Sequence, residues 1–277
     1  MVKFSSIKRY ERQILALIEK DLYLELRFKA RLITRFINPF IQLLVLFFVF
    51  GVIFSIREGY SIGYWNSRNY TLFLLIAFSI QFSRSITERY NHLFRREKYW
   101  KTLSAIMVAP VNRFNLLIGT IGSELVMISI PLIILFTIAI ILYPISWFYI
   151  FLVVVIFFSI YLIFASIGLI IGAFRISEES FIPYHMILLR VIFLFSCINY
   201  PMEIFPKIIQ SIVVLNPLYY IFDLMRLVWY LGFDYDAAIL LITPTHIIIT
   251  VILTIFSPII AVYIFNRIYK RYGITGY

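Results

Sequence analysis

Residues 125–174 read LVMISIPLIILFTIAIILYPISWFYIFLVVVIFFSIYLIFASIGLIIGAF and contain no charged side chain. A transmembrane helix needs about 20 apolar residues to cross the ~30 Å hydrocarbon core of a bilayer. The stretch is too long for a single helix, and the segment Tyr143-Pro144-Ile145-Ser146 divides it near its middle. We therefore predict two transmembrane helices here, over residues 114–142 and 147–174.

The composition of the whole chain also places it in a bilayer. Hydrophobic residues make up 62% and charged residues 14% of the 277 residues, whereas soluble domains are roughly 45–50% apolar and about 25% charged. The first apolar segment begins near Phe36, after a long charged stretch, so we interpret it as a retained anchor and not as a cleaved signal peptide. The predicted fold class is an all-α integral membrane protein.

Four further transmembrane helices follow from the same length criterion. Their predicted ranges are 36–56, 69–88, 181–198 and 244–266. The second of these carries Arg84 and Glu88 near its end, where a long arginine side chain can reach the interface. Residues 36–277 are therefore predicted to form one six-span transmembrane domain, preceded by a separate N-terminal segment, residues 1–35.

Lysine and arginine are distributed unevenly between the two predicted sides of the membrane. Nine lie in residues 1–35 and seven in residues 84–113, both on one side. The loops of the opposite side carry four: Arg57, Arg68, Lys207 and Arg226. Because cytoplasmic loops carry the excess of Lys and Arg, we predict a multi-pass protein of the plasma membrane with both termini in the cytoplasm. This topology accounts for the net charge of +11, and no nucleic-acid partner is predicted.

The N-terminal segment has the pattern of an amphipathic helix. Between Ile7 and Ile33, apolar residues recur at steps of three, four and seven, and most basic residues fall on the rest of the helix surface. Such a helix lies in the membrane interface with its basic residues toward anionic head groups. The periodicity leaves two roles open, a simple membrane anchor or a surface that contacts a cytoplasmic partner.

The loop after the second span is predicted to form a short cytoplasmic helix over residues 95–110. Trp100, Leu103 and Met107 lie on one face of this helix, and Pro110 ends it. A helix with an aromatic and apolar face can dock into a groove on another protein. The alternative is a helix that only lies in the membrane interface.

Residues 199–230, before the last span, are predicted to form a re-entrant helical hairpin on the external side. The segment Ile204–Leu215 is too short to cross a membrane, and Asn216-Pro217 separates it from a second short apolar helix, Leu218–Tyr230. Non-helical backbone at membrane depth is tolerated where protein or water satisfies it. The hairpin should therefore cap the bundle or border a pathway.

Glu124 and Arg190 are ionisable residues well within predicted spans, and such residues are functional candidates. Each lies about ten residues into its span, so both should be ~15 Å along their helices. We hypothesise that they pair or that each faces a polar cavity. Two other interpretations remain open: Glu124 could lie among the head groups, and Arg190 could bond backbone carbonyls.

The motifs in these segments resemble those of ABC type-2 transporter permeases. The run Glu97-Lys98-Tyr99-Trp100-Lys101-Thr102-Leu103 and the following Ala109-Pro110-Val111-Asn112-Arg113 are similar to that family's cytoplasmic coupling segment. Phe205-Pro206, the run LNPLYY at 215–220 and Arg226 are similar to its external re-entrant segment. The sequence departs from the family pattern at Lys101 and Ser104, where a glycine and a second acidic residue are usual.

The resemblance implies a permease subunit of an ATP-binding-cassette exporter. Two copies, or one copy and a paralogous permease, would form the pathway through the lipid, and a separate cytoplasmic ATPase subunit would bind ATP and magnesium. The implied ATPase-coupling contacts are Glu97, Tyr99, Trp100, Thr102, Leu103, Met107 and Pro110. The implied external segment includes Pro206, Asn216, Pro217, Tyr219, Tyr220 and Arg226. Drug, lipid, glycan and peptide exporters share this outline, so it does not identify the substrate.

The residues themselves argue against catalysis by this chain. ATP hydrolysis at a P-loop needs a Gly-Lys pair, and the sequence contains none. We therefore predict no catalytic residue, no bound cofactor and no metal site. One alternative is a membrane-embedded lipid-modifying enzyme, but His92, His185 and His246 are scattered and no H-E-x-x-H or G-x-S-x-G motif occurs. The other is an ion-coupled secondary transporter, which would call for more intramembrane carboxylates and broken helices in both halves.

Overall fold

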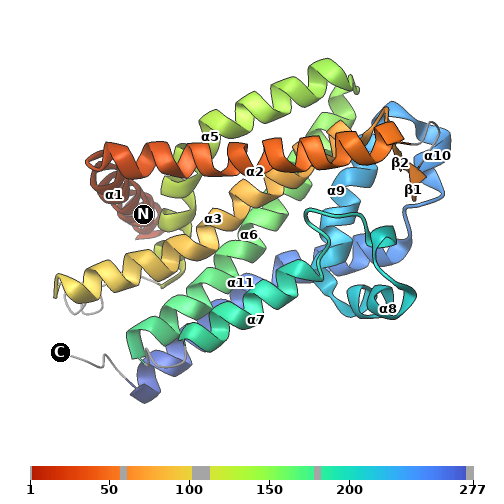
Figure 1. Cartoon of the computed structure of the whole chain (residues 1–277). Helices are drawn as coiled ribbons and strands as arrows, with labels where there is room; N and C mark the ends of the chain where they lie inside the picture. The colour runs from red at the N-terminus through yellow and green to blue at the C-terminus, as the bar shows by residue number, and fades with distance from the viewer. Residues whose placement is uncertain (1, 57–60, 102–112, 178–181, 273–277) are drawn as a thin grey trace.

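A computed structural model describes residues 2–56, 61–101, 113–177 and 182–272 of the chain (Figure 1). The first half contains α1 (Val2–Leu26), α2 (Lys29–Ile56), β1 (Ser61–Ile62), β2 (Trp65–Asn66), α3 (Tyr70–Tyr99) and α5 (Arg113–Leu142). The second half contains α6 (Trp147–Ser177), α7 (Ile182–Leu194), the 3-10 helix η2 (Met202–Ile204), α8 (Lys207–Leu215), α9 (Pro217–Phe233), α10 (Tyr235–Ile239) and α11 (Pro244–Tyr272). The described residues are all-α apart from the short antiparallel pair β1–β2.

Helix α6 lies at the centre of the bundle, against α3, α9 and α11. Its glycines allow α3 to approach closely, because a Cβ atom built on Gly168 would lie 3.0 Å from the Cα atom of Thr87. The Thr87 hydroxyl donates a hydrogen bond of 3.0 Å to the carbonyl of Phe164 on α6. Small residues and hydroxyl groups are the usual means by which helices pack in a membrane, where lipid is as apolar as the helices themselves.

The described residues contain four helices that are long and apolar enough to cross a membrane, namely α3, α5, α6 and α11. A fifth arises if α8 and α9 together form one broken span. The apolar part of α2, Phe40–Ser55, is shorter. The structure therefore gives an all-helical membrane protein with four or five candidate spans, and the six-span count stays a prediction.

Helix α7 is shorter than the span predicted at 181–198. It ends at Leu194 after 13 residues, about 20 Å at 1.5 Å per residue, which is less than the ~30 Å hydrocarbon core. The chain then turns, and Cys197 has a left-handed backbone with a φ of 57°. The carbonyls of Cys197 and Ile198 accept hydrogen bonds from the Arg226 side chain and not from the backbone N–H groups of a further helical turn.

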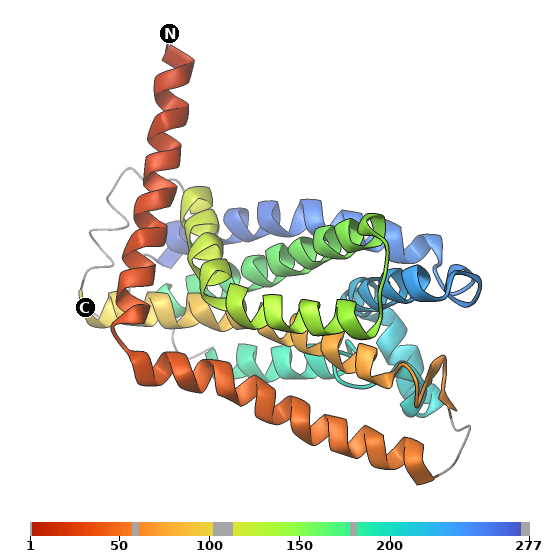
Figure 2. The ribbon, with the colours of Figure 1, turned by 90° about the horizontal axis from the view of Figure 1, so that it is seen from above.

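The predicted N-terminal segment, residues 1–35, is divided between two helices. Helix α1 ends at Leu26, and α2 begins at Lys29, so residues 29–35 belong to the helix that contains the first predicted span. Figures 1 and 2 show α1 running across one end of the bundle. Helix α1 packs on α5, where Leu17 covers Gly119.

The segment predicted as a re-entrant hairpin contains η2, α8 and α9. Helices α8 and α9 meet at a bend of 95°. Asn216 stabilises the bend, because its side chain accepts a hydrogen bond from the backbone N–H of Leu218 and donates one to the carbonyl of Ile192 on α7. Pro217 occupies the first turn of α9, where its missing N–H costs nothing. Helix α9 continues to Phe233 and is buried between α6 and α11.

Candidate functional site

The cytoplasmic helix predicted over residues 95–110 does not begin at Arg95. Helix α3 is continuous from Tyr70 to Tyr99, so residues 95–99 form the end of a 30-residue helix. The helix ends because Lys101 has a left-handed backbone with a φ of 56°, which does not continue a right-handed helix. Four of the predicted coupling residues lie outside the described residues: Thr102, Leu103, Met107 and Pro110.

The other three predicted coupling residues differ in their exposure. Tyr99 and Trp100 are 84% and 45% exposed at the end of α3. Glu97 is only 2% exposed, and it accepts a hydrogen bond of 2.5 Å from the Lys20 ammonium group of α1. Tyr99 and Trp100 therefore form an exposed surface, whereas Glu97 joins α3 to α1.

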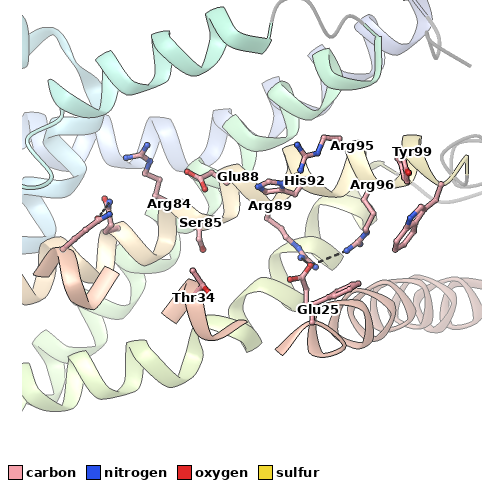
Figure 3. Close-up of a pocket in the computed structure, with 14 residues that line it drawn as sticks. Glu25, Thr34, Arg84, Ser85, Glu88, Arg89, His92, Arg95, Arg96 and Tyr99 are labelled. Carbon is pink, nitrogen blue, oxygen red and sulfur yellow. Dashed lines mark hydrogen bonds and ion pairs between the residues drawn. The ribbon is translucent and has the colours of Figure 1, made fainter. Parts of the chain in front are cut away.

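A network of buried ion pairs holds α1 against α3. Arg89 pairs with Glu25. Arg96 lies 3.4 Å from a carboxylate oxygen of Glu25 (Figure 3) and 3.4 Å from one of Asp21. Breaking such a pair leaves a buried charge without compensation and is strongly destabilising. The network therefore makes the position of α1 depend on the position of α3.

This network was not predicted, although the sequence contains two signals for it. Asp21 and Glu25 are four residues apart, and Arg89 and Arg96 are seven residues apart, so each pair lies on one face of its helix. The acidic residues of α1 were given no role in the prediction, and its basic residues were assigned to the head groups. Nothing in the chain order indicates that α1 crosses the end of α3.

Burial controls the charge state of Asp21. Its side chain is 4% exposed, and this burial raises the pKa of Asp21 above its ordinary value, even though the cations Arg89, Lys20 and Arg96 act in the opposite direction. Removing a carboxylate from water disfavours its ionised form. The desolvation of Asp21 thus outweighs the attraction of three neighbouring cations.

Glu124 extends the network to α5, and it does not pair with Arg190 as hypothesised. Its carboxylate is fully buried, accepts a hydrogen bond of 2.6 Å from the Ser85 hydroxyl and lies 3.9 Å from the Nε atom of Arg89. Arg190 is an exposed residue of α7. The pairing was wrong because depth alone does not determine neighbours: α5 packs on α3, while α7 packs on α6. The alternative, that each residue faces a polar cavity, stays a prediction.

A cavity of about 1050 Å³ lies between α3 and the α1–α2 corner (Figure 3). Its walls include Glu25, Ser85 and Trp100 together with four arginines of α3. The arginines are Arg84, Arg89, Arg95 and Arg96. The cavity thus reaches from the exposed Trp100 to the buried ion pairs, and its wall carries more cationic than anionic side chains.

At the opposite end of the bundle, Arg226 fixes the turn that follows α7. It is 1% exposed, and it donates hydrogen bonds of 2.7 and 2.6 Å to the carbonyls of Cys197 and Ile198. Its guanidinium group also lies 4.3 Å from the ring centre of Phe73 on α3. Arg226 is therefore a buried structural clamp and not an exposed loop charge.

Next to this clamp, Asp223 of α9 links the β1–β2 pair to α11. Asp223 accepts a hydrogen bond of 3.1 Å from the Tyr64 hydroxyl, and it lies 3.4 Å from the Nε2 atom of His246. Tyr219 and Tyr220 have their rings 6.5 and 5.3 Å from the ring of His246. Burial, followed by the charge of Asp223, raises the pKa of Tyr64 well above its ordinary value, so Tyr64 remains a neutral donor.

The remaining predicted external residue, Pro206, directly precedes α8. Residues 206 to 226 thus serve the packing of α8 and α9 and the turns beside them. Within the described ranges, no three His, Cys, Asp or Glu side chains are grouped so that they could hold a metal ion. The two polar regions are arranged to join helices, one at each end of the bundle.

The comparison with known proteins yields a family match. A family model described as "ABC-2 type transporter" matches residues 12–230. The match extends from α1 into α9 and includes both the ion-pair network and Arg226. No curated protein matches the chain.

Proposed function

The chain belongs to the ABC-2 type transporter family, and from this premise we propose that it is the permease subunit of an ATP-driven exporter that works with a separate ATPase subunit. The family assignment and the apolar helices make it a multi-pass membrane protein with a role in transport. The direction of transport, the ATPase partner and the subunit arrangement belong to the proposal.

The observation that carries the proposal is the continuity of α3. One 30-residue helix runs from the β1–β2 end of the bundle to Trp100, and it is tied to α1 by buried ion pairs close to that exposed end. A partner protein that pushes on Tyr99 and Trp100 would therefore move α3, and α1 would move with it. This is the mechanical link that an external motor needs.

The energy would come from the partner subunit. Phosphate binding by a P-loop needs a glycine-rich loop that ends in Gly-Lys, and no glycine of this chain is followed by a lysine. ATP and magnesium would therefore be bound by the ATPase subunit and not by the permease.

One feature supports the proposed orientation in the plasma membrane, and another supports a pathway that is shared between two permease copies. Helix α1 and the end of α11 lie at the same end of the bundle (Figure 2), as expected if both termini are cytoplasmic. Helix α2 presents exposed apolar side chains, including Leu44, Phe48 and Val52, which a second copy or membrane lipid would cover. A homodimer and a pair with a paralogous permease both fit this face.

The test is co-purification of the tagged full-length chain from its native membranes in a mild detergent. We expect a protein with a Gly-Lys P-loop to co-purify and the eluate to hydrolyse ATP. Trp100→Ala should lower the ATPase activity recovered per permease by roughly thirtyfold, since an aromatic interface anchor can contribute about 2 kcal/mol.

The matched control is Trp147→Ala. Trp147 is 85% exposed at the start of α6, at the other end of the bundle (Figure 2), so its loss should leave the recovered ATPase activity unchanged. The proposal fails if no ATPase co-purifies with the unmodified chain. The role of the α3 end fails if Trp100→Ala and Trp147→Ala behave alike.

A further inference from the structure

One face of α3 carries a continuous polar stripe. Its members recur at steps of three and four residues, the spacing of a single helix face: Gln81, Ser85, Glu88, His92, Arg95 and Tyr99. All of them line the cavity of about 1050 Å³ beside α3 (Figure 3). The stripe begins inside the span predicted at 69–88 and continues to the exposed end of α3. Because polar side chains within a membrane segment face a polar cavity and not lipid tails, we expect this cavity to hold polar contents.

The wall of the cavity carries surplus positive charge. The described residues that line it include four arginines and two carboxylates, Glu25 and Glu88. Arg95 is exposed and donates a hydrogen bond of 3.3 Å to the Nδ1 atom of His92. None of the described residues places a carboxylate oxygen within 4.0 Å of Arg95. A cleft with a surplus of one charge concentrates ligands of the opposite charge, so this cavity favours an anion.

Polar atoms of the cavity wall are buried without a hydrogen-bond partner among the described residues. The Nε atom of Arg96 is one of them, although its terminal nitrogens lie 3.4 Å from Asp21 and Glu25. The Oε1 atom of Gln81 is another, whereas its amide nitrogen donates a hydrogen bond of 3.4 Å to Gln42 of α2. An unpaired buried polar atom is destabilising, so a bound group that pairs with these atoms is favoured.

Helix α2 contributes both polar lining and apolar surface to the cavity. Thr34 and Gln42 line it. Ile37 and Ile41 lie between them at steps of three and four residues from Thr34, so they are on the same face of α2, and both are exposed. Trp100 also lines the cavity, and tryptophan is a residue type that gathers at the level of lipid head groups. This combination matches a ligand with an anionic head and apolar tails.

We propose that Arg95 and Arg96 bind the phosphate group of an anionic lipid, with the head group in the cavity and the tails along Ile37 and Ile41 of α2. Guanidinium groups suit this ligand because their planar donors bind phosphate oxygens in pairs. Basic pockets between membrane helices bind the head groups of anionic lipids in this way. The site requires only that the chain lies in a membrane, so it is independent of the proposed coupling to an ATPase.

The test measures lipid retention by native mass spectrometry. The full-length chain is purified in detergent and mixed with equal amounts of phosphatidylglycerol, which is anionic, and phosphatidylcholine, which is zwitterionic. We expect selective retention of phosphatidylglycerol. Arg95→Gln should weaken this retention about tenfold, because it removes a charge-assisted hydrogen bond to phosphate. Arg95→Gln/Arg96→Gln should weaken it further.

Two variants serve as controls for charge. Arg12→Gln removes an exposed arginine of α1 that does not line the cavity, so it changes the net charge equally and should leave the selectivity unchanged. Arg95→Lys keeps the charge and should retain part of the selectivity. Thermal unfolding checks that each variant is folded. Arg96 also pairs with α1, so the single variant Arg95→Gln decides the outcome if the double variant does not fold.

Glycerol 1-phosphate, a soluble head group without tails, separates the two sources of a phosphate group. Selective retention of phosphatidylglycerol that exceeds the retention of glycerol 1-phosphate supports the lipid and the role of the α2 face. Retention of glycerol 1-phosphate without selectivity between the two lipids overturns the lipid as the ligand and assigns the site to a soluble phosphate ester.

The proposal is overturned if the unmodified chain distinguishes neither lipid and binds no glycerol 1-phosphate. It is also overturned if folded Arg95→Gln retains phosphatidylglycerol as well as the unmodified chain does, or if Arg12→Gln weakens retention to the same extent as Arg95→Gln. The assay contains no ATPase, so a negative result removes the lipid site and leaves the permease assignment intact.

Discussion

At the scale of single residues, the charges inside the bundle serve two different purposes. Arg226 and Glu124 are fully or almost fully buried, and each is held by short hydrogen bonds to a neighbouring segment. Arg84 instead lies with its guanidinium group 4.5 Å from the ring centre of Phe193 and lines the cavity beside α3, and Arg190 is exposed on α7. Satisfied buried charges fix helix positions, whereas under-compensated ones are available to a ligand.

Asp21 leads to a prediction about pH. Its pKa is raised in the folded protein by burial, so its protonated form favours folding. The resulting stability is fully present below the ordinary pKa of 3.8 and is lost as the pH rises through the higher folded value. Asp21→Asn removes this titration, so its unfolding temperature should fall less than that of the unmodified chain as the pH rises from about 4 to 7.

The measurement is the thermal unfolding midpoint in detergent across that pH range. Glu19→Gln is the matched control, because Glu19 lies two residues earlier on the same helix but is exposed. Its curve should run parallel to that of the unmodified chain. A parallel curve for Asp21→Asn as well would show that burial does not control this carboxyl group.

At the scale of the elements, the contact between α3 and α6 depends on glycine. Gly168 and Gly172 are four residues apart on α6, and they face Thr87 and Phe94 of α3. This small-x-x-x-small spacing lets two helix backbones come close together in a membrane. Because α3 also carries the ion pairs with α1, the Gly168 contact helps to set the position of the proposed coupling end.

We expect Gly168→Ala to destabilise the protein by about 1–3 kcal/mol, the usual cost of overpacking. The new methyl group would lie 3.0 Å from the Cα of Thr87 and 3.2 Å from the carbonyl oxygen of Ile86, and backbone atoms cannot move aside independently. Gly51→Ala is the control, because its nearest neighbour would be the Tyr70 hydroxyl at 3.6 Å. Denaturant titration in mixed micelles measures both, and equal stabilities would contradict the packing argument.

At the scale of the whole molecule, the two ends of the bundle are chemically different. One end has the crossing helix α1, the end of α11 and the exposed end of α3 (Figure 2). The other has the β1–β2 pair, α10 and the start of α6 (Figure 1). The last turns of α3 and α11, at the first end, carry basic residues: Arg96, Lys98, Lys270 and Arg271. Under the positive-inside rule we predict that this end is cytoplasmic.

This orientation can be measured by cysteine labelling. In a Cys197→Ser background, single cysteines replace Arg12, Lys270 or Arg68, all of which are exposed. A membrane-impermeant maleimide added to intact cells should label Arg68→Cys and should leave the other two unlabelled until the cells are opened. Labelling of Arg12→Cys or Lys270→Cys in intact cells would overturn the predicted topology.

The sequence anticipated some parts of the candidate site better than others. It placed Trp100 at an exposed position beyond the second predicted span, and it identified Glu124 and Arg190 as unusual charges. It misjudged Glu97, which turned out to be buried against Lys20, and it missed the acidic residues of α1. Exposure of a helical residue depends on which element covers that face, and the crossing of α1 over α3 is not encoded in either segment alone.

By itself the sequence determined that the protein lies in a membrane and is helical. Long uncharged stretches and their interruption at Pro144 can be recognised within one segment of the chain, without knowledge of which helices pack together. It also determined the family, because a family model matches residues 12–230 of the sequence. Only the tertiary structure decided which charges meet: Glu124 lies beside Arg89, and Arg96 lies beside Asp21 and Glu25. The physical reason is that ion pairs and cavities form between helices far apart in the chain, and packing decides which helices become neighbours.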